Sequence, residues 1–365
     1  MPAFQFDPFS SQPNAANAAP TLQSAPGAFP SSGSTVYPPP PTQTTIPPGY
    51  PGYPAQPPYQ YSGGGLSGSG GVGQSGGLFS GLFGGGSNIG TPLEGPYTKL
   101  LDDLRLRYTW IAGSGPREVE VSDVDASVTL NWPNFLHSGQ PLSISPGFSF
   151  HFWDGPSLAT SNADLPGRAY SAFLDLSWTS NTQVRSGVEA NFVGGVYSDF
   201  TRTLTSDSLR FMGTGLGWMR LSESLWVKGG VTYIDRNDIK LLPAAGVFYY
   251  PSEDIRFEFY FPRPKFAQRM WTVGNTDIWG YLGGEYGGGS WTVVRARGTL
   301  AGTSEQVDIN ELRVFMGLEW LSGYVGVNGF LEVGYVFDRE LVYKRADPRS
   351  LPLKDAMMLR AGISF

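Results

Sequence analysis

The sequence predicts an all-β fold: an antiparallel transmembrane β-barrel of about 12–14 strands over residues 100–365, preceded by a disordered Pro- and Gly-rich tail over residues 1–95. Apolar and polar residues alternate through most of the second part of the chain. The alternating segments are longer than the usual strands of soluble sheets. The last of them ends on Phe365 at the C-terminus.

The composition excludes several classes of protein. The 365 residues include 25 Lys and Arg, 31 Asp and Glu, and no Cys. A net charge of −6 argues against a nucleic-acid partner, because phosphate contacts need clustered Lys and Arg. Without Cys there is no disulfide, thiolate zinc site or cysteine nucleophile. No run of about 18 apolar residues is present, which excludes a membrane-spanning helix.

Residues 1–95 form a tail of biased composition. Up to residue 93 they include no Lys, Arg or Trp and one acidic residue, Asp7. A Pro- and Tyr-rich part precedes a Gly- and Ser-rich part over residues 63–90, and neither buries enough apolar surface to offset its loss of chain entropy. We therefore expect a disordered tail, for which the sequence indicates no partner. Met1–Asp7 lacks the features of a secretory signal, so an exported chain would be a processed form or one that begins after its true start.

From about residue 103 onward the alternation has a period of two. In the segment from Asp123 to Trp132, apolar side chains fall on one face and Asp, Ser, Thr and Asn on the other. Successive side chains of a strand point to opposite faces, so this segment is predicted to be a strand with one apolar and one polar face. The same pattern occurs at 103–110, 170–179, 184–192, 255–261, 311–320 and 325–337.

Weaker strand candidates bring the expected total to about 14, with 12 as the alternative. Within 170–179, Phe173 is an exception, because it falls among the polar residues. No segment has a sustained apolar stripe with the helical period. The weaker candidates lie near 141–153, 206–220, 224–236, 239–250, 276–287, 290–300 and 355–365.

Three features favour a membrane barrel over a soluble β-sandwich. The candidate strands have about 9–14 residues, and about 9–11 tilted residues cross a bilayer. The polar faces are rich in Arg, Asp, Glu and Gly, which suits a water-filled lumen, whereas a charge that faced lipid near the bilayer midplane would cost about 2–4 kcal/mol. The apolar faces end in aromatic residues, as the interface girdles of membrane barrels do: Trp110, Trp132, Trp178, Trp320, Tyr335 and Phe337.

The C-terminal segment resembles the strand by which bacterial outer-membrane barrels are recognised for insertion. Apolar residues alternate along it up to the terminal aromatic residue. The resemblance implies the barrel-assembly machinery as a partner. The residues that match the pattern are Gly362, Ile363 and Phe365.

The block from Gly246 to Lys265, GVFYYPSEDIRFEFYFPRPK, is similar to a hairpin block in a family of uncharacterised bacterial outer-membrane β-barrel proteins. The resemblance covers at most residues 100–365 and does not include the tail. It implies a barrel fold and an outer-membrane location, and it implies no ligand.

Few residues are candidates for chemistry. His151 is the credible catalytic histidine, because it lies in a predicted strand and can face the lumen; the alternative is a solvated or loop-capping histidine. Asp123 and Asp125 share one face, as paired acids or metal ligands would, but no third ligand is visible, and a solvated wall is the alternative. We expect no cofactor and no metal.

Charges of both signs on the polar faces are expected to line the lumen. They can form cross-strand pairs that stiffen a closed wall, or a transverse field that selects solutes in an open pore. The sequence does not separate these two arrangements. The expected lumen residues are Arg105, Arg107, Asp123, Asp125, Asp175, Arg185, Glu189, Arg256, Glu258, Glu311, Arg313, Glu319, Glu332 and Arg360.

The sequence therefore predicts a protein of the bacterial outer membrane, in contact with its lipid, that passes small solutes passively or has a structural role without catalysis. Two alternatives stay open. One is a secreted soluble β-sandwich that binds carbohydrate or a surface partner through its Trp and Tyr side chains. The other is a barrel-wall hydrolase that uses His151.

Overall fold

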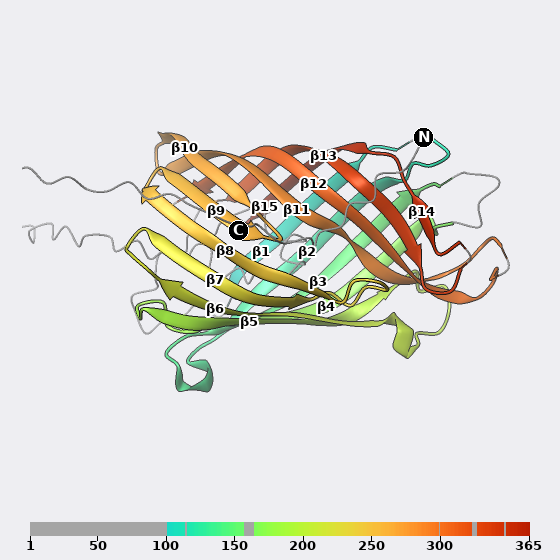
Figure 1. Cartoon of the computed structure of the whole chain (residues 1–365), viewed down its shortest axis with the longest axis horizontal. Helices are drawn as coiled ribbons and strands as arrows, with labels where there is room; N and C mark the ends of the chain where they lie inside the picture. Colours follow the sequence, from blue (N-terminus) through green and yellow to red (C-terminus); the bar gives the residue numbers. More distant parts are fainter. Residues whose placement is uncertain (1–100, 114, 157–163, 299, 323–326, 347) are drawn as a thin grey trace, which may run out of the picture. The chain divides into compact units, whose positions relative to one another are not determined.

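The computed structural model describes residues 101–365 except 114, 157–163, 299, 323–326 and 347 (Figure 1). The tail expected over residues 1–95 lies outside the described residues. The described chain consists almost entirely of strands, with two short 3-10 turns, η2 (Phe135–His137) and η3 (Ser206–Ser208). The strands are β1 (Leu101–Ile111), β2 (Glu120–Trp132), β3 (Leu142–Asp154), β4 (Arg168–Thr179), β5 (Ser186–Ser198), β6 (Leu209–Arg220), β7 (Leu225–Tyr233), β8 (Leu241–Ser252), β9 (Ile255–Phe261), β10 (Lys265–Val273), β11 (Thr276–Val294), β12 (Ser304–Ser322), β13 (Asn328–Tyr343), β14 (Ser350–Pro352) and β15 (Ala356–Ser364).

Fourteen of these strands close into an antiparallel barrel. Each strand from β1 to β13 pairs with the next one along the chain, and β13 also pairs with β15. β15 pairs with β1 from Arg105↔Ser364 to Ile111↔Met358, which closes the ring and leaves no free edge in it. β14 pairs only with the last residues of β13 and is not part of the ring. The expected barrel and the expected count of 14 strands are confirmed.

The connections between strands define two ends of the barrel. At the end where β15 finishes, the connections range from two residues, between β8 and β9 and between β10 and β11, to nine residues between β2 and β3. The opposite end carries longer connections, including 155–167, 199–208 and 344–355. We call these the turn end and the loop end.

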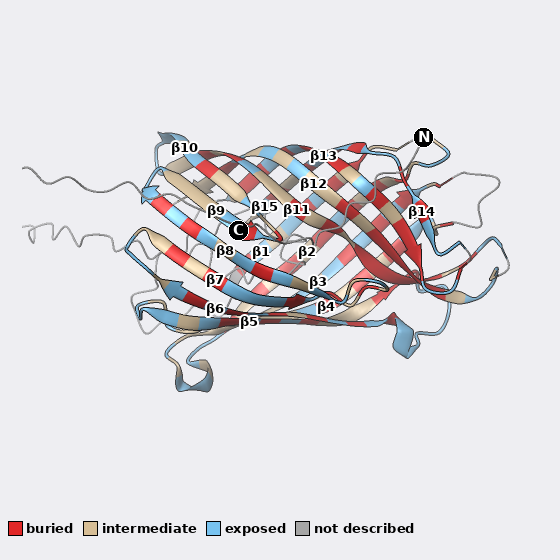
Figure 2. Ribbon diagram, in the orientation of Figure 1, coloured by how far each residue is buried: buried red, intermediate tan, exposed pale blue. Residues whose placement is uncertain are grey.

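Burial alternates along the strands, and the apolar face points outward (Figure 2). On β15, Met357 and Leu359 are 51% and 48% exposed, whereas Met358 and Arg360 between and beside them are 0% and 3% exposed. A second sheet packed on the apolar face would bury it. The soluble β-sandwich alternative is therefore wrong.

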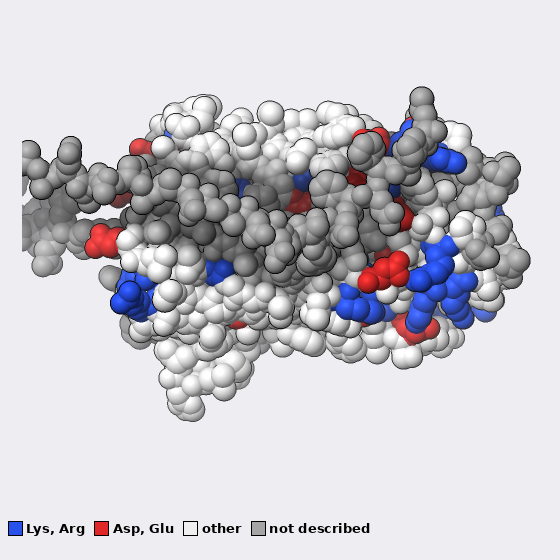
Figure 3. All heavy atoms as spheres, in the orientation of Figure 1, with Lys and Arg blue, Asp and Glu red and all other residues white. Residues whose placement is uncertain are grey.

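The outer surface carries aromatic side chains toward both ends of the belt. Trp132 pairs in register with Leu142, which pairs with Trp178, so the two Trp residues share one row at the turn end. Trp110 is the last but one residue of β1, at the loop end, and Tyr335, at the middle of the longer strand β13, pairs with Met357 near the loop end of β15. In Figure 3, charged side chains gather mainly near the ends of the barrel, and the surface between them is largely uncharged.

Among the described residues, no helix has the length and apolar character needed to cross a membrane.

The prediction was wrong about two strands, one that it divided and one that it missed. Residues 276–287 and 290–300 were expected as separate strands, but Thr276–Val294 is one continuous strand, β11, and 295–303 form its connection to β12. Lys265–Val273 is a strand, β10, that the alternation did not indicate, because a bulge between Arg269 and Trp271 shifts its register.

Phe173 is not a break in the alternation of β4, because its side chain is buried among the inward-facing residues. Two glycines make room for it. A Cβ at Gly147 would lie 2.5 Å from Phe173 Cζ, and a Cβ at Gly195 would lie 2.6 Å from Phe173 Cβ. The ring therefore occupies space that any larger residue on the neighbouring strands would fill.

Candidate functional site in the barrel lumen

The part of the β11–β12 hairpin nearest the loop end crosses the interior of the barrel. β10 stops pairing with β11 at Lys265↔Gly283, so β11 continues without that neighbour. Further along, Thr292 pairs with Ser198 of β5, and the Trp291 indole Nε1 donates to Ser171 Oγ of β4 at 3.1 Å. β4 and β11 are seven strands apart in a ring of fourteen, which places them on opposite walls. A direct bond between them requires the hairpin to span the lumen.

A local bend in β11 allows this crossing. Gly288 has a φ of +83°, a left-handed conformation that favours glycine. A Cβ at this position would lie 1.8 Å from the Ile309 carbonyl oxygen of the paired strand. Beyond the bend, residues 305–309 of β12 are buried on both faces, unlike the alternating lower part of the strand.

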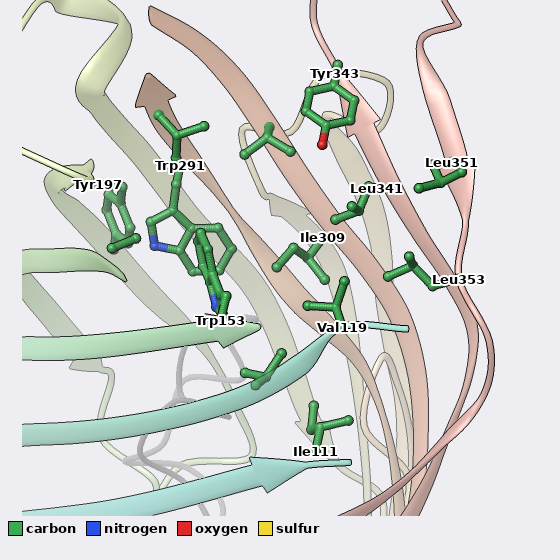
Figure 4. Close-up of a cluster of buried hydrophobic side chains, with 14 of the residues drawn as sticks. Ile111, Val119, Trp153, Tyr197, Trp291, Ile309, Leu341, Tyr343, Leu351 and Leu353 are labelled. Carbon is green, nitrogen blue, oxygen red and sulfur yellow. The ribbon is translucent and has the colours of Figure 1, made fainter. Parts of the chain in front are cut away.

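Apolar side chains from opposite walls meet under the loop end. We call this group the mouth cluster (Figure 4). Trp291 packs edge-on against Trp153 at 5.0 Å between ring centroids. These side chains come from the hairpin and from both sides of the ring, so they meet inside the bore at this end. The labelled members are Ile111, Val119, Trp153, Tyr197, Trp291, Ile309, Leu341, Tyr343, Leu351 and Leu353.

Charged side chains form hydrogen bonds and ion pairs between the loops and the β11–β12 hairpin. These contacts lie between the outward apolar belt and the loop end. Arg295 donates to Asp164 at 2.5 Å and to Glu305 at 2.5 Å. Burial alone would lower the pKa of Arg295, but the hydrogen bond and charge of Asp164, together with Glu305, raise it. Arg236 donates to Asn310 at 2.6 Å and to the Gly287 carbonyl at 2.8 Å, and its burial lowers its pKa.

A second group, the arginine–glutamate network, lines the wall formed by β11, β12, β13 and β15. Glu285 accepts from Arg313 at 3.0 Å and from Arg360 at 2.7 Å. Arg360 also donates to Glu332, and Arg313 also donates to Glu311. Of the two arrangements considered for the lumen charges, the structure shows cross-strand pairs. The network comprises Glu285, Glu311, Arg313, Glu332, Arg339 and Arg360.

Other inward charges are paired across neighbouring strands or close in space. Arg107 donates to Asp125 at 2.6 Å, Lys228 to Glu189 at 2.6 Å, and Lys265 to Glu319 at 2.8 Å. The carboxylates of all three pairs are almost completely buried. A buried charge needs such a partner, because an isolated one would lose its hydration without compensation.

The remaining predicted lumen residues have varied surroundings. Arg105 contacts Asp103, and Asp175 accepts a hydrogen bond from Asn191 at 2.5 Å. The Arg256 guanidinium lies 3.7 Å from the ring centroid of Trp279, and Glu258 accepts from Tyr250 at 3.4 Å. Arg185 was expected in a strand facing the lumen, but it is exposed in the turn before β5 begins at Ser186.

His151 belongs to a hydrogen-bonded chain across three strands. His151 Nδ1 lies 2.7 Å from Asp123 Oδ1, and His151 Nε2 lies 2.9 Å from Ser171 Oγ. The register places Asp123 opposite His151 and places His151 opposite Ala169, two residues from Ser171. His151 is 2% exposed, so it is neither solvated nor a loop cap.

A small cavity of about 40 Å³ lies beside this chain. His151, Ser171 and Trp291 line one part of it, and Arg107 and Glu285 line another. Within the described part of the chain, no group of three or more His, Asp or Glu is placed to hold a metal ion.

Sequence reasoning named His151 and Asp123 but not Ser171, Trp291 or Glu285. Ser171 is one of many serines on polar faces, and only the strand register brings it to His151. Glu285 lies in a Gly-rich stretch with weak alternation. At the C-terminus, Ile363 and Phe365 are exposed, and Gly362 is buried against the Phe330 ring.

Comparisons with known proteins give matches of structure but none of sequence. No protein family and no curated protein matches the chain. The structure is similar to a KdgM porin, at 9% identity and a TM-score of 0.32, covering 72% of this chain and 98% of that chain. It is also similar to an outer membrane channel from Pseudomonas putida F1, at 11% identity and a TM-score of 0.36, covering 73% and 96%. A third match is the translocator domain of the autotransporter NalP from Neisseria meningitidis, at 12% identity and a TM-score of 0.33, covering 73% and 86%.

Proposed function

We propose that this chain is an integral protein of the bacterial outer membrane and forms a narrow, low-conductance passage for small solutes, constricted by the β11–β12 hairpin. The closed ring and its outward apolar belt support the membrane location, because a spanning structure must pair every backbone polar group internally. Most connections beside the C-terminus are shorter than most of those at the other end, which supports the orientation of outer-membrane barrels, with the turn end periplasmic.

The C-terminal strand supports a proposed contact with the barrel-assembly machinery. Ile363 and Phe365 face outward at the turn end, where they are accessible to a partner before the ring closes. After assembly, the same outward face contacts outer-membrane lipid.

The observation that carries the proposed constriction is the bond from Trp291 on one wall to Ser171 on the other. A ring of 14 strands has a bore between that of small filled barrels and that of 16-stranded porins. The hairpin and the mouth cluster occupy that bore at the loop end, and the inward charges that remain are mostly paired. Little free cross-section is left for solutes.

Removing the hairpin from the lumen tests this proposal. In one variant, residues 289–309 are replaced by Asn-Gly, which joins the paired Gly288 and Asn310 by a two-residue turn. We expect the single-channel conductance in planar bilayers to rise several-fold above that of the unmodified protein. Trp291→Ala should produce a smaller rise, because it removes the largest side chain of the hairpin from the bore.

Trp132→Ala is the matched control, since Trp132 is 62% exposed on the outside at the turn end. It should leave the conductance unchanged. Heat-modifiable gel migration shows for each variant that the barrel has folded. A conductance of the unmodified protein as high as that of the hairpin deletion would overturn the constriction, and a folded protein that stays outside membranes would overturn the location.

A further inference from the structure

Three inward side chains on adjacent strands form the arrangement of a serine-hydrolase triad. Asp123 on β2 contacts His151 on β3, and the other ring nitrogen of His151 contacts Ser171 on β4, at 2.7 and 2.9 Å. Nucleophile, base and orienting acid are thus each within hydrogen-bond reach of the next, which is the geometry that activates a serine. We propose that the lumen wall contains a hydrolase site for short-chain acyl esters, with Ser171 as nucleophile. This activity goes beyond passive passage.

The Trp291 indole fixes the direction of one hydrogen bond of Ser171. An indole N–H can only donate, so Ser171 Oγ accepts from Trp291. The Ser171 hydroxyl can then donate its own proton to His151 Nε2. In that arrangement Nε2 carries no proton, and the Nδ1 proton of His151 points to Asp123. This is the protonation state that a general base needs before it accepts the serine proton.

Burial in this wall does not by itself produce a hydrogen-bonded chain like that of Asp123, His151 and Ser171. Ser149 lies two residues before His151 on the same inward face, and its buried hydroxyl has no hydrogen-bond partner among the described residues. The buried Thr109 hydroxyl, opposite Asp123 in the register, also has no hydrogen-bond partner among the described residues. The wall therefore accommodates unbonded hydroxyls, whereas Ser171 has two bonds.

The cavity beside Ser171 limits the size of the substrate. Its volume of about 40 Å³ suits an acetyl-sized acyl group rather than a fatty acyl chain. The Trp291 ring packs edge-on to His151 at 4.9 Å and Trp153 stacks on it at 5.9 Å, so the imidazole is held on both sides. A rigid base and a small pocket favour a short, compact ester.

The proposed reaction consumes one water per ester. Ser171 Oγ attacks the ester carbonyl carbon while His151 Nε2 takes the hydroxyl proton. The ester C–O bond then breaks, and the alcohol leaves with that proton from His151. Water attacks the acyl-serine, passes a proton to His151, and the carboxylic acid leaves as Ser171 regains its proton. The Asp123 carboxylate accepts from His151 Nδ1 and stabilises the imidazolium in each half-reaction.

Covalent labelling with methanesulfonyl fluoride, a serine-directed reagent whose sulfonyl group is close to acetyl in size, tests the site in the full-length protein inserted in lipid vesicles. We expect a methanesulfonyl adduct on Ser171, located by tandem mass spectrometry, and hydrolysis of p-nitrophenyl acetate that the reagent abolishes. Ser171→Ala should remove the adduct. His151→Gln should slow labelling by about 10³-fold, and Asp123→Asn should slow it by a smaller factor.

Ser149→Ala is the matched control, because it removes an inward hydroxyl of the same strand wall without touching the chain. It should label at the unmodified rate. Heat-modifiable migration confirms folding of each variant. If the folded, unmodified protein gains no adduct on Ser171, or if labelling is equally fast in folded His151→Gln, the three residues form a structural hydrogen-bond chain only and the proposal is wrong.

Discussion

Single residues on the inward face decide how the wall packs. The clearest case is Gly147, where an added Cβ would lie 2.5 Å from the Phe173 ring. On the other side of Phe173, a Cβ at Gly195 would lie 2.6 Å from Phe173 Cβ, so both neighbouring strands approach this residue closely. We expect Gly147→Ala to lower the free energy of unfolding by about 1–3 kcal/mol. The measurement is the shift in the midpoint of urea unfolding, with the folded fraction followed by heat-modifiable gel migration.

Gly215→Ala is the control for this prediction, since a Cβ there meets no atom within 4 Å. Its urea midpoint should stay near that of the unmodified protein. Adding Phe173→Leu to Gly147→Ala should recover part of the loss. Equal effects of the two glycine variants would show that backbone freedom, and not the Phe173 ring, governs stability at Gly147.

Asp308 gives a pH-dependent prediction. It lies on β12 above the outward apolar belt and is fully buried, and burial raises its pKa above the ordinary 3.8. A raised pKa means that the folded state favours the protonated acid, so Asp308 stabilises the fold most at low pH and loses that contribution as the pH rises through its pKa. We expect Asp308→Asn to raise the urea midpoint at pH 7, and the difference from the unmodified protein to shrink at pH 4. A midpoint that falls at pH 7 would contradict the argument.

At the scale of strands, the alternation predicted the fold class, the strand count and the inward position of most charges. It failed where the period of two is interrupted. In β10 the bulge beside Arg269 places Met270 and Trp271 both on the outside, 54% and 50% exposed. In β11 two separate strands were predicted, 276–287 and 290–300, but one strand continues from Thr276 to Val294 with the bend at Gly288.

The Asp123–His151–Ser171 chain shows the corresponding limit for the site. Its members are separated by 28 and 20 residues along the chain. A polar, inward position was predictable for Asp123 from alternation alone. Their contact depends on the register of two hairpins. Alternation fixes the face to which each residue points, but a shift by two residues keeps the faces and changes the partners, so turn geometry is needed as well.

The last strand carries a prediction that separates recognition from stability. Phe365 exchanges backbone hydrogen bonds with Leu104, at 3.1 and 3.3 Å, and presents its ring outward. Phe365→Ser keeps the backbone bonds and removes the ring. We expect it to reduce assembly into the outer membrane in cells sharply, while refolding into detergent micelles in vitro stays near normal.

Deleting Phe365 removes both the ring and the backbone bonds, so it should reduce assembly in cells and also slow refolding in vitro. Phe365→Tyr is the conservative control and should assemble normally. Normal assembly of Phe365→Ser, measured by heat-modifiable migration in membrane fractions, would show that the terminal ring is not part of a recognition signal.

At the scale of the whole molecule, the polarity of the barrel is inverted relative to a soluble protein. Its wall buries charges in pairs and exposes apolar side chains, and the two groups alternate residue by residue. In water, an exposed apolar belt would bring chains together; in a bilayer the same belt contacts acyl chains. The lipid, and not a second protein layer, is therefore expected to supply the environment that stabilises the outer face.

Leu331→Arg tests that expectation directly. Leu331 is 57% exposed on β13, between Gly329, which pairs with Trp320 at the turn end, and Tyr335 toward the loop end. If lipid surrounds it, a charge there should cost about 2–4 kcal/mol of folding free energy in vesicles. If water surrounds it, the exposed position should tolerate Arg within about 0.5 kcal/mol. Leu204→Arg, in the connection between β5 and β6 at the loop end, is 44% exposed and provides the matched change outside the belt. We expect the urea midpoint in vesicles to fall for Leu331→Arg and to stay unchanged for Leu204→Arg, because only the first charge must leave water when the barrel inserts.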